Sequence, residues 1–205
     1  MKIQRLVMAT HNAKKGTEMR TILQRRFPDI EVVTLVDYPG APEPEETGKT
    51  YAENAAIKSE SAARFTGEWC VADDAGLEID FFNGAPGLYS KRFIGEDTPF
   101  ADKMAYVLEK MKDVPENRRG ARFRTFVALS KEGQPTRLVE GVCEGRIAWR
   151  QAGTGGFGYD PIFYLPELAC TMAELTPDQK QAVSHRGKAL KLLGDLIERI
   201  NSSPA

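Results

Sequence analysis

The stretch Trp69-Cys70-Val71-Ala72-Asp73-Asp74-Ala75-Gly76 sets an apolar run against two adjacent carboxylates and a small-residue turn. The apolar run is typical of a short buried strand. We expect this strand to end at the aspartates and Gly76 to let the chain turn or approach a ligand closely. Two adjacent anions repel, so at least one needs a cation or a proton. The pattern predicts a metal or general-base site at a strand edge; a solvated acidic turn is the alternative.

The composition is that of an ordinary globular chain, with 205 residues, 41% of them hydrophobic and 28% charged. This length suits one large domain or one two-lobed domain. Basic and acidic residues number 28 and 29, for a net charge of -1. This balance excludes a general attraction to nucleic acid or to an anionic membrane, so any bound anion must be held by a local cluster.

The compartment is indicated by the cysteines and by the apolar segments. Cys70, Cys143 and Cys170 are far apart and form no CxxC motif, which fits a reducing compartment. The chain start carries no signal-peptide pattern, and no apolar stretch approaches the roughly 20 residues that cross a bilayer. We therefore expect a cytoplasmic protein.

The amino-terminal segment has the order strand, polar loop, helix. Residues 6–9 predict the strand, and the apolar spacing of residues 19–27 predicts the helix. A helix start offers free N–H groups and the positive end of its dipole to a phosphate. Thr10 and Asn12 add short polar side chains and Lys15 adds a cation, although the glycine-rich P-loop pattern is absent. A helix cap followed by a solvated basic turn is the alternative.

An acidic loop, residues 37–48, follows a second predicted strand at residues 30–35. The loop is either a linker or the carrier of a metal-binding carboxylate, Glu45 or Glu46. Thr50 and Glu53 form a capping box that starts a helix. Lys58 on that helix faces either the site or the solvent.

The middle of the chain predicts a mixed sheet. Residues 77–81 alternate like a half-buried strand, and Thr98-Pro99 opens a further helix. Residues 122–130 and 138–149 predict an antiparallel hairpin. We therefore expect an α/β fold with helices on the faces of a mixed sheet.

The loop Gly153-Thr154-Gly155-Gly156-Phe157-Gly158-Tyr159-Asp160-Pro161 is the second informative stretch. Its glycines admit backbone conformations closed to other residues. Its Phe, Tyr and Asp suit a flat ligand that stacks on an aromatic face and meets one carboxylate; a structural turn is the alternative. Lys180, His185 and Arg186 follow, before a closing helix.

These stretches resemble the inosine triphosphate pyrophosphatase family, the XTP/dITP diphosphatases that remove non-standard purine nucleotides. The matches occur in the family's order and cover almost the whole chain, so chance does not account for them. They are residues 9–15, 45–48, 53–55, 72–74, 84–90, 155–161 and 184–187.

The resemblance implies an elongated mixed sheet with flanking helices, a single domain over residues 1–205 with two lobes enclosing an active-site cleft, and a homodimer. It implies Mg²⁺-dependent cleavage of ITP, dITP or XTP between the α- and β-phosphates, which yields the monophosphate and pyrophosphate. Asp74 is expected to act as general base with support from Asp73, and Mg²⁺ to bind Asp74 with Glu45 or Glu46. The expected substrate contacts are Thr10, His11, Asn12, Lys15, Lys58, Ala75, Phe157, Gly158, Tyr159, Asp160, Lys180, His185 and Arg186.

The resemblance also implies a selection among purine bases, which has a physical explanation. Hypoxanthine and xanthine carry a 6-oxo acceptor where adenine carries a 6-amino donor, so donors from His185 and Arg186 would reject adenine. The chain departs from the family pattern twice. His11 stands where Gly is frequent, and Ala75 stands where Ser or Thr is frequent, which leaves any contact there to the backbone N–H.

Three other functions compete with this interpretation. A pyrophosphatase for modified pyrimidine nucleotides would differ only in its substrates. A nucleotide-binding module without hydrolysis would not need the carboxylates of Glu46 and Asp74. A nucleic-acid-binding protein is disfavoured by the net charge and by the lack of a basic stripe.

Overall fold

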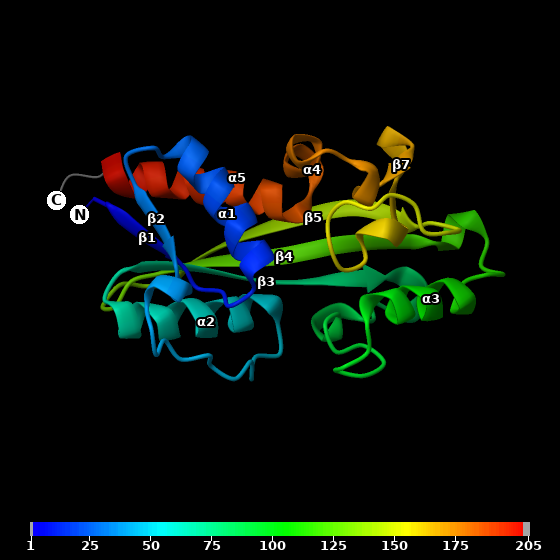
Figure 1. The fold of residues 1–205 in the computed structure, drawn as a ribbon, viewed down its shortest axis with the longest axis horizontal. Coiled ribbons are helices and arrows are strands. Elements are labelled where there is room, and N and C mark those ends of the chain that lie inside the picture. Colours follow the sequence, from blue (N-terminus) through cyan, green and yellow to red (C-terminus); the bar gives the residue numbers. More distant parts are fainter. Residues whose placement is uncertain (1, 203–205) are drawn as a thin grey trace. The chain divides into compact units, whose positions relative to one another are not determined.

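The computed structural model describes residues 2–202, which form two compact units. The first, the Asp73 unit, holds the described residues up to Asp74, Thr125–Gly141 and those from Arg186 onward; the second, the Phe157 unit, holds Ala75–Arg124 and Val142–His185. The strands are β1 (Arg5–Met8), β2 (Glu31–Thr34), β3 (Trp69–Ile79), β4 (Gly120–Ser130), β5 (Arg137–Ile147), β6 (Phe163–Leu165) and β7 (Cys170–Thr171) (Figure 1). The helices are α1 (Ala13–Arg26), α2 (Tyr51–Thr66), α3 (Phe100–Lys110), α4 (Pro177–Val183) and α5 (His185–Ser202).

The strands form a mixed sheet in the order β2-β1-β3-β4-β5-β6-β7. β1 pairs in parallel with β2 and β3, whereas β6 is antiparallel to β5 and β7. The predicted α/β fold with a mixed sheet is therefore confirmed, while a cleft enclosed by two lobes stays a prediction. None of the described helices is long and apolar enough to span a membrane.

Side chains in the Asp73 unit alternate between the two faces of the sheet, as the two-residue period of a strand requires. Trp69 and Val71 of β3 join an apolar cluster with α1 and α5, whereas Cys70 and Ala72 join another with α2. Figure 1 shows α1 and α5 on one side of these strands and α2 on the other. The same alternation sends Asp73 toward α1 and α5, and Asp74 toward α2.

β3 does not end at the aspartates, contrary to the sequence prediction. It runs unbroken from Trp69 to Ile79, because Leu77 and Ile79 continue the buried alternation beyond Gly76 and β4 remains its neighbour. Pairing with β1 stops at Val71. The two carboxylates therefore lie inside β3, just beyond the point where its pairing with β1 ends.

Helix starts agree closely with the local sequence signals. The predicted capping box of Thr50 and Glu53 is present at the start of α2. α3 begins one residue later than expected, because Pro99 is its N-cap and not its first helical residue. The sequence prediction missed α4 and the short strands β6 and β7.

Candidate active site

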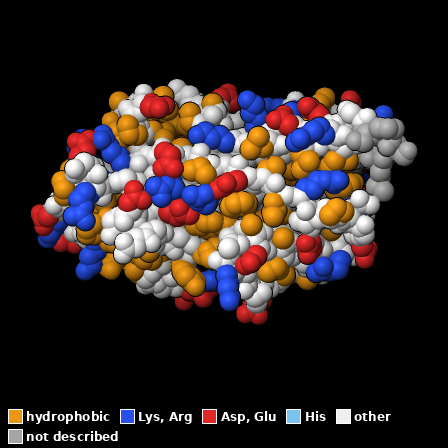
Figure 2. Space-filling model, turned by 180° about the vertical axis from the view of Figure 1, so that it is seen from behind, with side chains coloured by type: hydrophobic (Ala, Val, Ile, Leu, Met, Phe, Trp, Pro, Cys, Tyr) orange, Lys and Arg blue, Asp and Glu red, His pale blue; other side chains and the backbone are white. Residues whose placement is uncertain are grey.

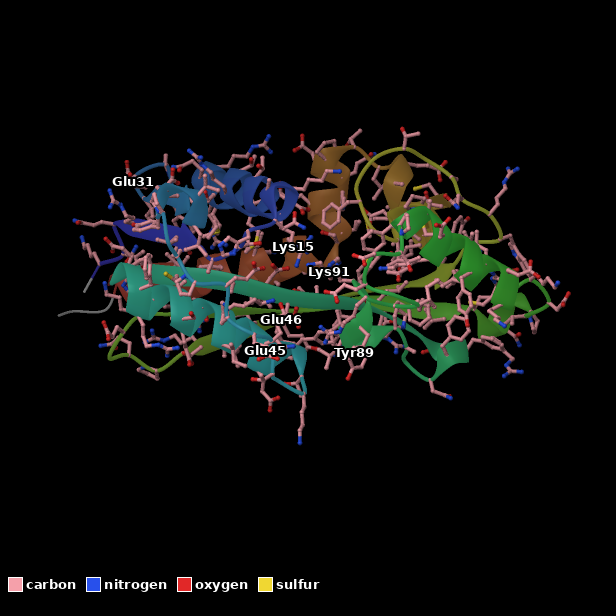
Figure 3. All side chains as sticks on the ribbon, turned by 60° about the horizontal axis from the view of Figure 1, so that its bottom comes forward. Lys15, Glu31, Glu45, Glu46, Tyr89 and Lys91 are labelled. Atoms are coloured by element: carbon pink, nitrogen blue, oxygen red, sulfur yellow. The ribbon has the colours of Figure 1, made fainter. Side chains whose placement is uncertain are left out.

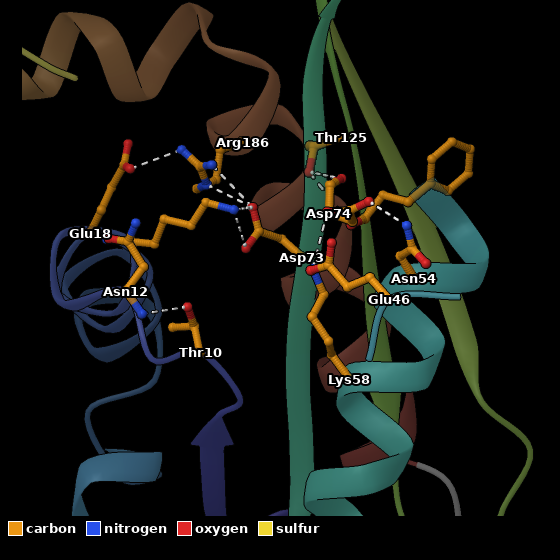
Figure 4. A network of polar contacts seen from close by, with 12 residues as sticks. Thr10, Asn12, Glu18, Glu46, Asn54, Lys58, Asp73, Asp74, Thr125 and Arg186 are labelled. Carbon is orange, nitrogen blue, oxygen red and sulfur yellow. Dashed lines mark hydrogen bonds and ion pairs between the residues drawn. The ribbon is translucent and has the colours of Figure 1, made fainter. Parts of the chain in front are cut away.

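Asp73 is buried among charges on the α1 and α5 face of β3 (Figure 4). Its Oδ2 accepts hydrogen bonds from Arg186 Nη2 at 3.0 Å and Nε at 3.3 Å, and Lys15 Nζ lies 3.3 Å from the same oxygen. The remaining terminal nitrogen of Arg186, Nη1, donates to Glu18 at 3.0 Å. Lys15 and Glu18 come from α1 and Arg186 from the first turn of α5, so two helix starts supply the charges around Asp73.

Asp74 faces α2 and has a separate set of partners. Lys58 Nζ lies 3.1 Å from Asp74 Oδ1 and 2.9 Å from Glu46 Oε1, so one ammonium bridges two carboxylates. Asn54 Nδ2 donates to Asp74 Oδ2 at 3.3 Å, and Thr125 Oγ1 donates to the Asp74 carbonyl at 3.0 Å. Lys58 therefore faces the site and not the solvent.

Asn54 also fixes the loop that carries Glu46. Its Oδ1 accepts the N–H of Gly48 at 2.8 Å, and a Cβ at Gly48 would overlap the Asn54 side chain. Glu45 and Glu46 are both exposed residues of this loop (Figure 3). Of the two, Glu46 is the one joined to Asp74 through Lys58.

The polar loop after β1 shapes the start of α1. Thr10 Oγ1 accepts the N–H of Asn12 at 3.1 Å, and Asn12 Oδ1 caps the helix by accepting the N–H of Lys15 at 3.1 Å. The capping alternative is thus present, but Lys15 is directed to Asp73 and not to solvent. His11 is exposed in the turn.

The pKa values of the two aspartates shift in opposite directions. Burial opposes the ionisation of Asp73, but Lys15, Arg186 and Lys58 outweigh burial and hold its pKa well below the ordinary value. Burial raises the pKa of Asp74, and the Glu46 carboxylate adds to this rise against the effect of Lys58. Two carboxyl groups whose pKa values are pushed apart suit different roles, one as a fixed anion and one as a proton acceptor.

The glycine-rich loop is held by a buried ion pair in the Phe157 unit. Asp160 Oδ2 accepts from Lys180 Nζ at 2.7 Å and from the Phe157 N–H at 2.9 Å. The Lys180 ammonium also lies 4.6 Å from the centroid of the Phe157 ring. Gly156 has a φ of 71°, and a Cβ there would overlap the Asp160 carboxylate, so only glycine fits. Asp160 and Lys180 therefore shape the loop that carries Phe157.

Tyr159 and His185 are buried within the same unit. The Tyr159 hydroxyl donates to the Ser90 carbonyl at 3.0 Å, and the His185 ring stacks on Phe123 with centroids 4.9 Å apart. Contact of these residues with a nucleotide base stays a prediction. So does the reading of the 6-oxo group by Arg186, whose donors bond Asp73 and Glu18 in this structure.

A magnesium site was predicted at Asp74 with Glu45 or Glu46. Within residues 2–202, no group of three or more His, Cys, Asp or Glu side chains is arranged to hold a metal ion. Glu46 and Asp74 form a pair of carboxylates, both of which contact the Lys58 ammonium. Mg²⁺ is usually bound by one or two carboxylates and completes its shell with waters and substrate phosphates, so this donor set fits it.

Glu18, Asn54 and Thr125 bond Arg186 or Asp74 and are not among the residues predicted from the sequence. Glu18 lies three residues after Lys15 on one helix face, a spacing that could have indicated it. Asn54 lies within a stretch that was matched but not assigned a role. Thr125 is 51 residues from Asp74 and reaches it only through sheet pairing, so no local signal marked it.

The mixed sheet and its paired carboxylates and cations define an α/β protein with an ionic site beyond the end of a parallel strand. The chain belongs to the Ham1 family, whose sequence model matches residues 6–196. The dITP/XTP pyrophosphatase of Exiguobacterium sibiricum is 49% identical to it over 92% of this chain and 94% of the relative. The Ham1 protein structure from Coxiella burnetii is similar with a TM-score of 0.85 and 39% identity, over 97% of this chain and 100% of that one. The resemblance drawn from the motifs is confirmed.

Proposed function

We propose that this protein is a nucleoside triphosphate pyrophosphatase that hydrolyses non-standard purine nucleoside triphosphates to the monophosphate and pyrophosphate. The observation that carries the proposal is the pair of aspartates on opposite faces of β3, each joined to its own cations. Relatives with 45–49% identity that bear the name dITP/XTP pyrophosphatase support the substrate class. Catalysis would proceed by attack of water on the α-phosphorus and departure of pyrophosphate.

The chain's own residues divide this work by their electrostatics. Asp74, with its raised pKa and partly exposed side chain, accepts the proton of the attacking water. Lys15 and Lys58 supply positive charge for the phosphates, while Asp73 remains an anion that holds Lys15 and Arg186 in place. The Phe157 ring offers a stacking face for the base.

Glu46 and Asp74 would hold Mg²⁺. When bound, this ion offsets the negative charge of the triphosphate. Lys58, which bridges the same two carboxylates, would then turn to the phosphates.

Binding of nucleic acid is the weaker alternative. Lys and Arg side chains are interspersed with Asp and Glu over the face shown in Figure 2, without a continuous basic stripe on that face. A contact surface for the phosphate backbone usually needs a basic patch or stripe.

The proposal is tested by pyrophosphate release from dITP, XTP, ITP, GTP, ATP and modified pyrimidine triphosphates, with and without Mg²⁺. We expect release from the first three at a kcat/KM at least about a hundredfold above that for ATP, the discrimination available to a site that hydrogen-bonds the substrate. Faster release from a pyrimidine triphosphate would support the related pyrophosphatase. Tight binding without release would support the non-hydrolysing module.

Glu46→Gln is expected to raise the Mg²⁺ concentration for half-maximal rate by about tenfold, the lower range for loss of a metal-site group. Glu45→Gln should change it by less than about twofold, because Glu46 is the carboxylate joined to Asp74. Titration of the rate with Mg²⁺ at saturating dITP separates the two variants. The reverse order would assign the metal to Glu45.

A further inference from the structure

Lys103 is the most unusual charged residue of the Phe157 unit. It lies on α3, is 1% exposed, and is not among the site residues predicted from the sequence. Its ammonium donates to the Lys91 carbonyl and lies 5.2 Å from the centroid of the Phe100 ring. Among the described residues, no salt bridge joins this ammonium to a carboxylate. Burying an ammonium without a carboxylate is costly, so a mere space-filling role would be better served by Met or Leu.

The hydrogen bond of Lys103 falls on the segment Tyr89–Arg92, which Tyr159 also holds. The Lys91 carbonyl is held by Lys103, and the preceding Ser90 carbonyl is held by the Tyr159 hydroxyl at 3.0 Å. Ser90 Oγ in turn accepts the N–H of Leu77 at 2.9 Å. Two consecutive carbonyls of the segment are thus held from different elements: that of Lys91 by α3, and that of Ser90 by the glycine-rich loop.

Phe100 extends the same connection to the glycine-rich loop. Its ring meets the Tyr159 ring edge to face, with centroids 5.3 Å apart, and a Cβ at Gly158 would lie 3.7 Å from it. Tyr89 and Lys91 project from the held segment (Figure 3), and the Arg92 guanidinium lies 5.0 Å from the Tyr89 ring centroid. The Lys103 ammonium therefore contacts both the Tyr89–Arg92 segment and Phe100, the ring that packs on Tyr159.

We propose that Lys103 is a positioning residue that holds the Tyr89–Arg92 segment against the Tyr159 end of the glycine-rich loop, and so sets the shape in which that loop receives the substrate base. The effect on substrate rests on the proposed function, whereas the clamp itself does not. Lys103 touches no reacting atom in this role. Its removal should weaken nucleotide binding and leave the chemical step at Asp74 intact.

The experiment compares Lys103→Met, which keeps the stem and removes the ammonium, with Lys103→Arg and with Lys110→Met. Lys110 is an exposed lysine of the same helix and serves as the matched control. The first readout is native-state trypsin cleavage after Lys91 and Arg92, followed by fragment mass. Lys103→Met should cleave about tenfold faster than wild type, the factor implied by losing one hydrogen bond from a charged donor in a local opening. Lys110→Met should match wild type.

The second readout is steady-state kinetics with dITP and Mg²⁺, with urea unfolding as a check on folding. We expect Lys103→Met to raise KM about five- to tenfold with kcat within about twofold, and Lys103→Arg to restore most of both effects. An unchanged cleavage rate, or an unchanged KM in an active protein, would overturn the proposal. If wild-type protein releases no pyrophosphate, the proposed function fails, and the cleavage rates still decide whether Lys103 holds the segment.

Discussion

Asp74→Asn is expected to lower kcat for dITP by at least about a hundredfold while the protein folds normally, within the 10²–10⁴-fold range attributed to acid–base groups. Asn has the shape of Asp, and the Thr125 hydrogen bond to the backbone carbonyl of residue 74 does not depend on the side chain. The amide, however, cannot accept the proton of the attacking water. It also removes one of the two carboxylates that Lys58 bridges. The measurement is kcat for pyrophosphate release at saturating Mg²⁺, with urea unfolding in parallel.

The matched control for this variant is Asp80→Asn. Asp80 directly follows the end of β3 in the Phe157 unit, and its carboxylate pairs with Arg122 of the same unit at 3.1 Å. Its replacement should leave kcat within about twofold, since surface ion pairs contribute little. Retention of more than about a tenth of the wild-type kcat in Asp74→Asn would refute the assignment of Asp74 as the base.

Asp73→Ala is expected to destabilise the protein by about 3–5 kcal/mol, the range for removing one partner of a buried ion pair. The carboxylate is 2% exposed and faces an Arg186 side chain that is also 2% exposed. Its loss removes the ion pair of Lys15 with Asp73. The ion pair of Arg186 with Glu18 stays in place. The free energy of unfolding from urea titration gives the result directly.

Asp73→Asn serves as the comparison for this loss. It keeps an oxygen that can accept from Arg186 but removes the charge, so its destabilisation should lie between those of wild type and Asp73→Ala. Glu109→Ala, which breaks the exposed pair with Lys112, should have no measurable effect on unfolding. A loss below about 1 kcal/mol for Asp73→Ala would mean that the buried charges compensate one another without this carboxylate.

Local signals predicted well whatever depends on residues close in sequence. The strand, polar loop and helix at the amino terminus, the capping box of Thr50 and Glu53, and the hairpin of β4 and β5 all follow from short-range patterns. The same patterns gave the wrong end for β3, because Asp73, Asp74 and Gly76 are residues typical of a strand end. Burial of Leu77 and Ile79 in the core of the Phe157 unit keeps the strand extended past them.

The roles of individual site residues were decided by tertiary contacts. His185 and Arg186 are adjacent in sequence, but His185 stacks on Phe123 and Arg186 bonds Asp73. Their joint contact with a nucleotide base stays a prediction. Lys180 and Asp160 bond each other and shape the loop around Phe157, while their contact with substrate stays a prediction.

The sequence by itself determined the ingredients of the site: two adjacent aspartates beyond an apolar run, a cationic helix start, an acidic loop and a glycine-rich aromatic loop. Only the tertiary structure decided which partner each aspartate has. Because β3 continues as a strand, its side chains alternate, and Asp73 meets Lys15 and Arg186 while Asp74 meets Lys58. Those partners lie 58, 113 and 16 residues away in sequence. Charged side chains interact according to the distance between them in space. That distance is set by the packing of the helices on the sheet, and it cannot be read from the order of residues along the chain.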